Sequence, residues 1–289
     1  MKRIYLVTGI GGHIGGAVVR ALLDAGETVR GLALPREDVT NLYHDHISIV
    51  RGDVRDLKSL EPLFLGLGPD DEAIVIHAAG IVSTESTLRK HVIDVNVTGT
   101  KNVVSLCRAH AVKKLVYVSS VQAIPEYPKG VIVFEVGKFS PDAVGDLYAK
   151  TKAEATQAVL DAARDGLNAT VVQPSGVINP FDYGESGVMQ MAKSCLDGSL
   201  VANLEGGFDF VDVRDVAKGI LAAAERGKSG ECYILSNRYY SVSELVGKFC
   251  ALTGAPKVKG TMPMWLAFLT APFSALYHRL KRETPLYRG

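Results

Sequence analysis

Short apolar runs typical of buried β-strands alternate with longer stretches typical of helices through most of this chain. The strand-like runs cover residues 4–7, 28–34, 47–50, 73–78, 114–119 and 169–173. The helical stretches cover residues 17–24, 57–64, 95–110 and 147–163. Continuous apolar strands separated by helices indicate a parallel sheet that is covered by helices on both faces. The pattern therefore predicts a doubly wound α/β fold.

The alternation becomes irregular beyond residue 178, where Gly and Pro are dispersed among short helical stretches. We predict a larger domain over residues 1–178 and a mainly substrate-binding lobe over residues 179–289. The lobe is expected at the carboxyl edge of the sheet, where ligands bind in such folds. Strands near residues 208–213 and 231–235 are expected to return to the larger domain.

A strongly apolar segment covers residues 262–277. It is shorter than the ~20 residues that a membrane-spanning helix needs, and Pro272 interrupts it. An integral membrane span is therefore not expected. Two interpretations stay open: a helix that walls an apolar pocket, which is favoured, and an interfacial helix that touches a membrane.

The charges of the chain are balanced, with 32 Lys and Arg against 31 Asp and Glu in 289 residues. Nothing in this balance points to nucleic acid as a partner. The four cysteines are scattered without the spacing of a zinc site or a disulfide framework. We predict free thiols in the reducing environment of the cytoplasm, a small-molecule substrate, and no metal.

A glycine-rich turn follows the first strand-like run and precedes the first helical stretch. Gly9, Gly12 and Gly15 have the spacing of a dinucleotide-binding turn, with His13 and Ile14 between the last two. Such a turn needs glycine for a positive φ, for close approach of the backbone to a pyrophosphate, and for packing of the helix on the sheet. The amides that open the helix would then face the phosphates. The predicted fold is therefore of the Rossmann type.

Tyr148 and Lys152 are four residues apart in an alanine-rich stretch that is free of Gly and Pro. Residues at this spacing lie on one face of a helix, so we expect the ammonium of Lys152 beneath the phenol of Tyr148. A nearby cation favours the phenolate and lowers the pKa of a tyrosine from about 10. The pair predicts a group that exchanges a proton with a substrate hydroxyl near neutral pH.

Further motifs follow in a characteristic order. They are Gly-Asp-Val-Arg-Asp at 52–56, His-Ala-Ala-Gly at 77–80, Asn-Val-Thr-Gly-Thr-Lys-Asn at 96–102, a strand ending in Ser-Ser at 116–120, Gln-Pro-Ser-Gly-Val at 173–177 and a strand-to-helix sequence at 210–217. With the glycine turn and the Tyr–Lys pair, they resemble the extended short-chain dehydrogenase/reductase family, also called the NAD-dependent epimerase/dehydratase family. The resemblance runs from residue 2 to about residue 245.

The resemblance implies a proton relay of Ser120, Tyr148 and Lys152, with Asn96 stabilising the active-site geometry. Ser119 stays a competing candidate for the serine, because a shift of one residue would exchange the two roles. The resemblance also implies contacts with the cofactor. The implied cofactor residues are Gly9, Gly12, His13, Ile14, Gly15, Asp53, Val54, Ala78, Ala79, Gly80, Tyr148, Lys152, Pro174, Gly176 and Val177.

The end of the second strand bears on the choice between NAD and NADP. A carboxylate there binds the ribose 2′-hydroxyl of NAD, and an arginine accommodates the 2′-phosphate of NADP. Ala33 occupies the position where the acid is expected, and Arg36 lies just beyond it. Arg36 could pair bidentately with a phosphate, so the sequence weakly favours NADP(H).

We expect an oxidoreductase that interconverts a secondary alcohol and a ketone on a moderately apolar, cyclic substrate, nearest the dihydroflavonol reductase and 3-beta-hydroxysteroid dehydrogenase branches. The alternative is a nucleotide-sugar 4-epimerase or dehydratase with tightly bound NAD, although Gly176 stands where such epimerases carry an asparagine. A dinucleotide-binding sensor without turnover is a third hypothesis. The resemblance also implies a homodimer built on helices 95–110 and 147–163, and it leaves open a native chain that continues past Gly289.

Overall fold

The computed structural model describes residues 2–39, 47–68, 70–83, 89–128, 130–178, 180–182, 186–200, 202–256, 258 and 260–262. The chain divides into two compact units. The first contains residues 1–181 and 211–236, and the second contains residues 182–210 and 237–289.

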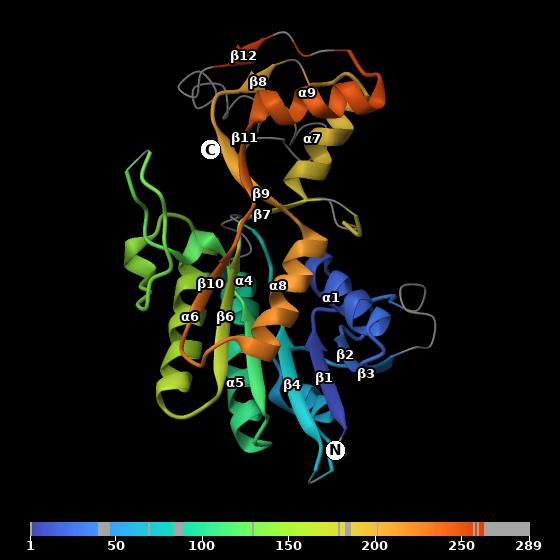
Figure 1. Ribbon diagram of the computed structural model, residues 1–289, viewed down its shortest axis with the longest axis vertical. Coiled ribbons are helices and arrows are strands. Elements are labelled where there is room, and N and C mark those ends of the chain that lie inside the picture. Colours follow the sequence, from blue (N-terminus) through green and yellow to red (C-terminus); the bar gives the residue numbers. More distant parts are fainter. Residues whose placement is uncertain are drawn as a thin grey trace. The chain divides into compact units, whose positions relative to one another are not determined.

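The first unit is built on a seven-stranded sheet in the order β10-β6-β5-β4-β1-β2-β3 (Figure 1). Its strands are β1 (Arg3–Thr8), β2 (Thr28–Ala33), β3 (Ser48–Arg51), β4 (Glu72–His77), β5 (Lys114–Val118), β6 (Ala169–Pro174) and β10 (Cys232–Leu235). Every neighbouring pair is parallel. This confirms the predicted doubly wound sheet of the Rossmann type.

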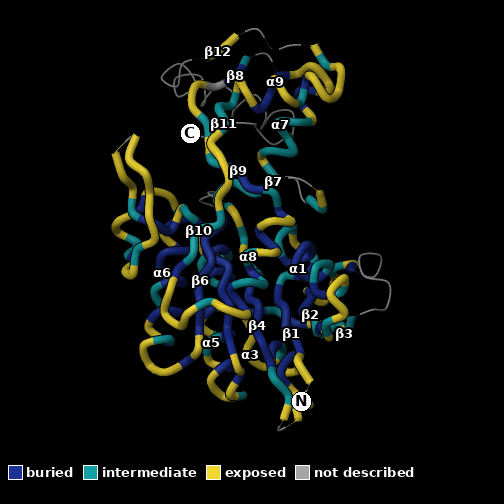
Figure 2. The backbone as a smooth tube through the Cα atoms, in the orientation of Figure 1, coloured by how far each residue is buried: buried dark blue, intermediate teal, exposed yellow. Residues whose placement is uncertain are grey.

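Helices cover both faces of the sheet, because alternate residues of each buried strand point to opposite faces. On one face, Tyr5 and Val7 of β1 pack with α1 (His13–Asp24) and α8 (Val213–Arg226). On the other, Ile4 and Leu6 pack with α3 (Leu57–Leu60), α5 (Gly99–Ala109) and α6 (Leu147–Arg164). The continuous burial of the central strands is visible in Figure 2. These two apolar layers hold the strand ends in fixed positions.

The strand order reverses between β1 and β4, which lie side by side although β2 and β3 separate them in the chain. The register pairs Thr8, the last residue of β1, with His77, the last residue of β4. Ligands of open parallel sheets bind at such a switch point, outside the carboxyl ends of the strands.

The second unit contains α7 (Gly187–Leu196), β8 (Asn203–Leu204), β11 (Arg238–Ser241), α9 (Val242–Thr253) and β12 (Thr261–Met262). Cys195, Leu200, Val246 and Cys250 form its small core. Residues 263–277 of the apolar segment, to which the two interpretations apply, lie outside the described residues.

The run near 208–213 does not join the large sheet, although residues 211–213 belong to the first unit, whereas the run near 231–235 joins that sheet as β10. The first run forms β9 (Gly207–Asp212), which pairs antiparallel with β11, and β7 covers Gly176–Ile178. Its sequence alternates Phe208, Asp209 and Phe210, and Phe208 is largely exposed. Alternation is typical of a strand with one solvated face, whereas a central parallel strand is apolar on both faces.

Among the described residues, none of the helices has both the length and the apolar character that crossing a membrane requires.

Candidate active site

The glycine turn joins β1 to α1 and has no room for side chains. Gly9 has a φ of +74°, and a Cβ on it would lie 2.7 Å from the amide nitrogen of Ala79. A Cβ on Gly15 would overlap the carbonyl oxygen of Gly9 and lie 2.7 Å from its carbonyl carbon. Gly12 is the N-cap of α1 and brings no capping side chain. A glycine turn that leads directly into a helix N-terminus is the arrangement that binds a pyrophosphate.

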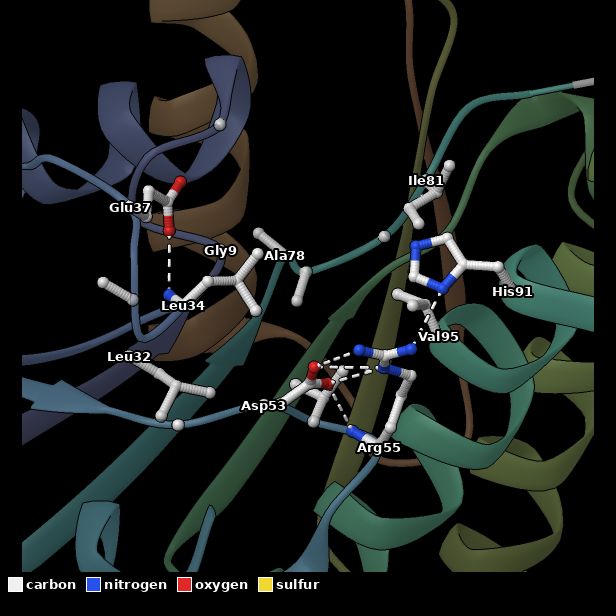
Figure 3. Close-up of a pocket in the computed structure, with 16 residues that line it drawn as sticks. Gly9, Leu32, Leu34, Glu37, Asp53, Arg55, Ala78, Ile81, His91 and Val95 are labelled. Atoms are coloured by element: carbon white, nitrogen blue, oxygen red, sulfur yellow. Dashed lines mark hydrogen bonds and ion pairs between the residues drawn. The ribbon is translucent and has the colours of Figure 1, made fainter. Parts of the chain in front are cut away.

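A pocket lies at the switch point, next to the glycine turn (Figure 3). Glycine and small residues from the ends of β1 and β4 meet residues from the ends of β2 and β3 and from α4 (Arg89–Ile93). The lining residues are Gly9, Gly12, Leu32, Ala33, Leu34, Glu37, Gly52, Asp53, Val54, Arg55, Ala78, Ala79, Gly80, Ile81, His91 and Val95. Seven of the predicted cofactor residues are therefore brought together in one pocket: Gly9, Gly12, Asp53, Val54, Ala78, Ala79 and Gly80. The glycines that line the pocket fit a dinucleotide, because side chains at these positions would fill the space that the phosphates need.

Asp53 is held by Arg55 at one end of this pocket. Nε of Arg55 donates to Oδ1 of Asp53 at 3.0 Å, and Nη2 donates to Oδ2 at 2.6 Å. These hydrogen bonds hold the pKa of the Asp53 carboxyl below its usual range. Nη1 of Arg55 also lies 3.0 Å from Nδ1 of His91, so the guanidinium lies between the two side chains in Figure 3. The motif at 52–56 includes Arg55 but did not indicate its contact with Asp53 or with His91.

Glu37, and not Arg36, lines the pocket beyond the end of β2. Its Oε2 accepts a hydrogen bond from the backbone amide of Leu34 at 3.0 Å (Figure 3). A Cβ on Gly11 would lie 2.6 Å from the Glu37 carboxyl carbon, so this carboxyl group also packs against the glycine turn. Arg36 is exposed. The sequence interpretation considered Arg36 and missed the acid that follows it.

The remaining predicted cofactor residues lie outside that pocket. His13 and Ile14 open α1, and Nε2 of His13 lies 3.0 Å from the carbonyl oxygen of Pro180. Pro174 ends β6, and Gly176 and Val177 belong to β7.

Tyr148 lies in the first turn of α6, where Asp146 caps the helix by accepting a hydrogen bond from Ala149 N at 2.8 Å. Its side chain is 8% exposed. Burial raises the pKa of Tyr148 to about 12, and the side-chain hydrogen bond with Ser120 opposes the rise. Ser120 is therefore close enough to Tyr148 to influence the pKa of its phenol.

Ser119 is engaged elsewhere. Its Oγ lies 2.6 Å from Oγ1 of Thr156 on α6, and the pair is buried. Ser120 has an extended backbone and accepts a hydrogen bond from Gln122 N at 3.2 Å, which opens a short 3-10 helix over Val121–Ala123. The surroundings favour Ser120, because the Ser119 hydroxyl is paired with Thr156 and Ser120 is the serine that lowers the pKa of Tyr148.

Lys152 follows Tyr148 by one helical turn and is 5% exposed. Its Nζ donates to the carbonyl oxygen of Val118 at 2.9 Å and lies 3.5 Å from the phenolic oxygen of Tyr117. Burial lowers the pKa of Lys152 to about 8. The expected lowering of the Tyr148 pKa by Lys152 is therefore wrong for this structure, because the ammonium is directed at Val118 and burial of the phenol is the larger effect.

The lowered pKa of Lys152 implies a stability that depends on pH. In the unfolded chain a lysine has a pKa of about 10.4. The cost of burying the ammonium is therefore fully present below the folded pKa of about 8 and fades as the pH rises toward the unfolded value. From pH 7 to pH 9.5, the free energy of unfolding should rise by about 2 kcal/mol relative to Lys152→Met.

Chemical denaturation of both proteins at the two pH values measures this difference. Lys150→Met, at an exposed position on the same helix, is the matched control and should show no such divergence. Parallel pH profiles for wild type and Lys152→Met would contradict the buried ammonium.

Asn96 lies in a π-helical turn, Asp94–Thr98, that separates α4 from α5. The prediction of one helix over 95–110 missed this turn. Asn96 is 1% exposed, and its side chain binds both backbone groups of Ile81: Oδ1 accepts from the amide at 2.8 Å and Nδ2 donates to the carbonyl at 3.0 Å. Nδ2 also lies 3.0 Å from Oγ1 of Thr151, whose hydroxyl donates to the carbonyl oxygen of Tyr148 at 2.8 Å. Asn96 thus joins the strand end at the pocket to the helix that carries Tyr148.

Within the described residues, no cluster of three or more His, Cys, Asp or Glu is placed to hold a metal ion.

A glycine-lined pocket at the switch point of a parallel sheet, beside a buried Ser–Tyr–Lys group, defines a dinucleotide-binding enzyme of the Rossmann type. The model of the NAD dependent epimerase/dehydratase family matches residues 5–236. The chain belongs to this family, and it is an NAD(P)-dependent enzyme of the extended short-chain dehydrogenase/reductase type.

Two curated relatives and one solved structure are similar over most of the chain. Sterol demethylase protein B of Methylococcus capsulatus is 32% identical over 98% of this chain and 85% of its own length. A putative dihydroflavonol 4-reductase of Synechocystis is 30% identical over 92% of this chain and 77% of its own length. The crystal structure of gox2253 covers 99% of this chain and 85% of its own, with 29% identity and a TM-score of 0.82.

Proposed function

We propose that the protein interconverts a secondary alcohol and a ketone by hydride transfer, with Ser120, Tyr148 and Lys152 as its proton relay. The observation that carries the proposal is that Ser120, Tyr148 and Lys152 are all buried, with Lys152 one helical turn after Tyr148 on α6. When bound, the nicotinamide ring supplies or accepts the hydride, and the protein supplies alignment.

Each residue of the relay has a role that its surroundings support. Ser120 would hold the substrate oxygen by a hydrogen bond while Tyr148 exchanges a proton with it. Because burial raises the pKa of Tyr148 to about 12, the phenol is protonated at neutral pH and suited to protonate a ketone oxygen during reduction. Lys152 would bind the ribose hydroxyls next to the nicotinamide, and Asn96 would act as a positioning residue through Ile81 and Thr151.

We propose a moderately apolar, cyclic ketone or alcohol as substrate. The names of two relatives, a sterol demethylase protein and a putative dihydroflavonol reductase, support this class. The alternative is a nucleotide-sugar 4-epimerase or dehydratase with tightly bound NAD, which the family description supports.

A screen of cyclic ketones, sterols and UDP-sugars separates the two functions. A reductase should consume NADH or NADPH in proportion to the ketone reduced, as followed by absorbance and by product stereochemistry. An epimerised UDP-sugar without net cofactor turnover would defeat the reductase proposal. Specific cofactor binding without turnover of any substrate class would support the sensor hypothesis.

We propose a weak preference for NADP(H), which Arg36 favours and Glu37 opposes. A 2′-phosphate near the end of β2 would be attracted by the Arg36 guanidinium and repelled by the Glu37 carboxylate. We expect Arg36→Ala to lower the NADP/NAD ratio of affinities by about five- to ten-fold and Glu37→Ala to raise it by a similar factor. Titration of each variant with both cofactors measures the ratio. An unchanged ratio in Arg36→Ala would show that this arginine is only a loop residue.

We further propose a cytoplasmic homodimer that pairs α5 and α6 of two subunits. The buried, free thiols of Cys107, Cys195, Cys232 and Cys250 support a reducing compartment. The family resemblance supports the dimer, and a solution mass near twice 31.0 kDa would agree with it.

A further inference from the structure

His77 is a fully buried histidine at the end of β4 that the proposed proton relay does not use. Its side chain is 0% exposed, and both ring nitrogens have partners. Nδ1 lies 2.7 Å from Oγ1 of Thr8, and Nε2 lies 3.0 Å from Oγ1 of Thr100. A histidine with both nitrogens engaged inside the core must adopt one tautomer if every partner is to be satisfied.

The direction of each hydrogen bond in this group can be derived from its partners. The Thr100 hydroxyl donates its single proton to the carbonyl oxygen of Asn96 at 2.7 Å, so its oxygen can only accept from the ring. The proton of neutral His77 is therefore on Nε2. Nδ1 then accepts the proton of Thr8, whose oxygen in turn accepts from the amide of Ala79 at 3.2 Å. The result is one directed chain of hydrogen bonds from Ala79 through Thr8, His77 and Thr100 to Asn96.

The two ends of this chain lie at different parts of the site. Thr8 immediately precedes Gly9, and Ala79 lines the cofactor pocket. Asn96 holds Ile81 and, through Thr151, the first turn of α6. Between these ends, the His77 ring stacks on Tyr117 with the ring centroids 5.5 Å apart, and the phenol of Tyr117 lies 3.5 Å from Nζ of Lys152.

Because His77 stays neutral, the direction of this series of hydrogen bonds does not change with pH. Burial and the neighbouring Lys152 ammonium lower the pKa of His77 to about 3. A protonated ring would donate from both nitrogens and reverse the bond to Thr8. Above about pH 4, the ring is expected to remain neutral.

We infer that His77 is a positioning residue that, as the Nε2–H tautomer, fixes the cofactor turn and the Asn96 turn relative to each other. The kinetic part of this inference rests on the proposed function, whereas the tautomer and the effect on cofactor binding do not. Each end of the chain should then affect a different step: Thr8 the binding of the cofactor, and Thr100 the turnover that depends on Asn96.

Isosteric variants remove one link each with little change in volume. Thr8→Val leaves the Ala79 amide and Nδ1 without a partner, and we expect about ten-fold weaker cofactor binding with kcat within about three-fold. Thr100→Val leaves Nε2–H without a partner and removes the hydroxyl hydrogen bond to the Asn96 carbonyl, and we expect about ten-fold lower kcat with cofactor binding within about three-fold. Thr100→Ser restores the hydroxyl and should recover most of kcat.

The matched control is Thr170→Val in β6. Thr170 is also 0% exposed, and its hydroxyl donates to the carbonyl oxygen of Lys228 at 3.0 Å, remote from the pocket. Its loss should lower the melting temperature as the other two variants do, but leave kcat and cofactor binding unchanged. If Thr8→Val and Thr100→Val also changed only the melting temperature, the positioning role would be overturned.

A direct readout of the tautomer needs no turnover. In protein labelled with ¹⁵N-histidine, long-range proton–nitrogen correlation spectra should show His77 as the Nε2–H tautomer from pH 5 to pH 9. A Nδ1–H tautomer or an imidazolium in this range would overturn the inference even if the enzyme reduces ketones. If no ketone is reduced, the tautomer and the loss of cofactor affinity in Thr8→Val still test the inference separately from the proposed function.

Discussion

Replacing Tyr148 with phenylalanine is expected to lower kcat by about 10³-fold or more while cofactor affinity stays within about three-fold. The variant keeps the ring that packs at the start of α6 and removes only the phenolic hydroxyl. Because this hydroxyl is the proposed proton donor, the loss should appear in the chemical step. Single-turnover kinetics with saturating cofactor measure that step directly.

Tyr5→Phe is the matched control for this loss. Tyr5 is 2% exposed and lies in β1 near the amino end of the sheet, away from the glycine turn. Its replacement removes a buried hydroxyl without touching the site, so kcat should be unchanged. If Tyr148→Phe kept more than about a tenth of the wild-type kcat, Tyr148 would not be the proton-exchanging group.

Replacing Gly15 with alanine is expected to weaken cofactor binding by about 100-fold or more. The added Cβ would overlap the Gly9 carbonyl oxygen and lie 2.7 Å from the Gly9 carbonyl carbon, and both atoms are backbone. The start of α1 must then move away from the turn, and the amides that face the phosphates move with it. Calorimetric titration of the variant with NADH and NADPH measures the loss.

Gly247→Ala provides the control for the glycine substitution. Gly247 lies in α9, where an added Cβ would have no atom within 4 Å, so cofactor affinity should not change. A circular dichroism spectrum and melting curve of Gly15→Ala establish whether the fold survives. Normal affinity in a folded Gly15→Ala protein would contradict the assignment of this turn to the cofactor.

Most of the first unit could be predicted from the sequence because its strands are buried on both faces. Runs such as 73–78 and 114–119 have no polar side of their own, and only a sheet covered by two helical layers buries them completely. The glycine turn was predictable for a similar reason, since no other residue fits at Gly9 or Gly15. The run at 208–213 forms a strand outside the large sheet, because its alternating Phe and Asp residues suit a strand with one solvated face.

The parts of the site that escaped prediction depend on contacts between distant residues. The π-helical turn at Asn96 is associated with the two hydrogen bonds to Ile81, which no local pattern encodes. The direction of the Lys152 side chain depends on the Val118 carbonyl at the end of β5, which accepts a hydrogen bond from the ammonium. Glu37 reaches the pocket because the chain turns back after β2. In this turn the Leu34 amide donates a hydrogen bond to the Glu37 carboxyl group.

The central claim is that the protein moves a hydride to the carbon of an apolar ketone while Tyr148 protonates its oxygen. The most direct test uses reduced cofactor deuterated at C4 of the nicotinamide, in separate samples for each face, together with the cyclic ketone that the screen identifies. Mass spectrometry should find one deuterium at the new carbinol carbon with one face only, in proportion to the cofactor oxidised, and almost none in the same time with Tyr148→Phe. An alcohol product without deuterium from either face, or a UDP-sugar epimerised with no net oxidation of cofactor, would contradict the account.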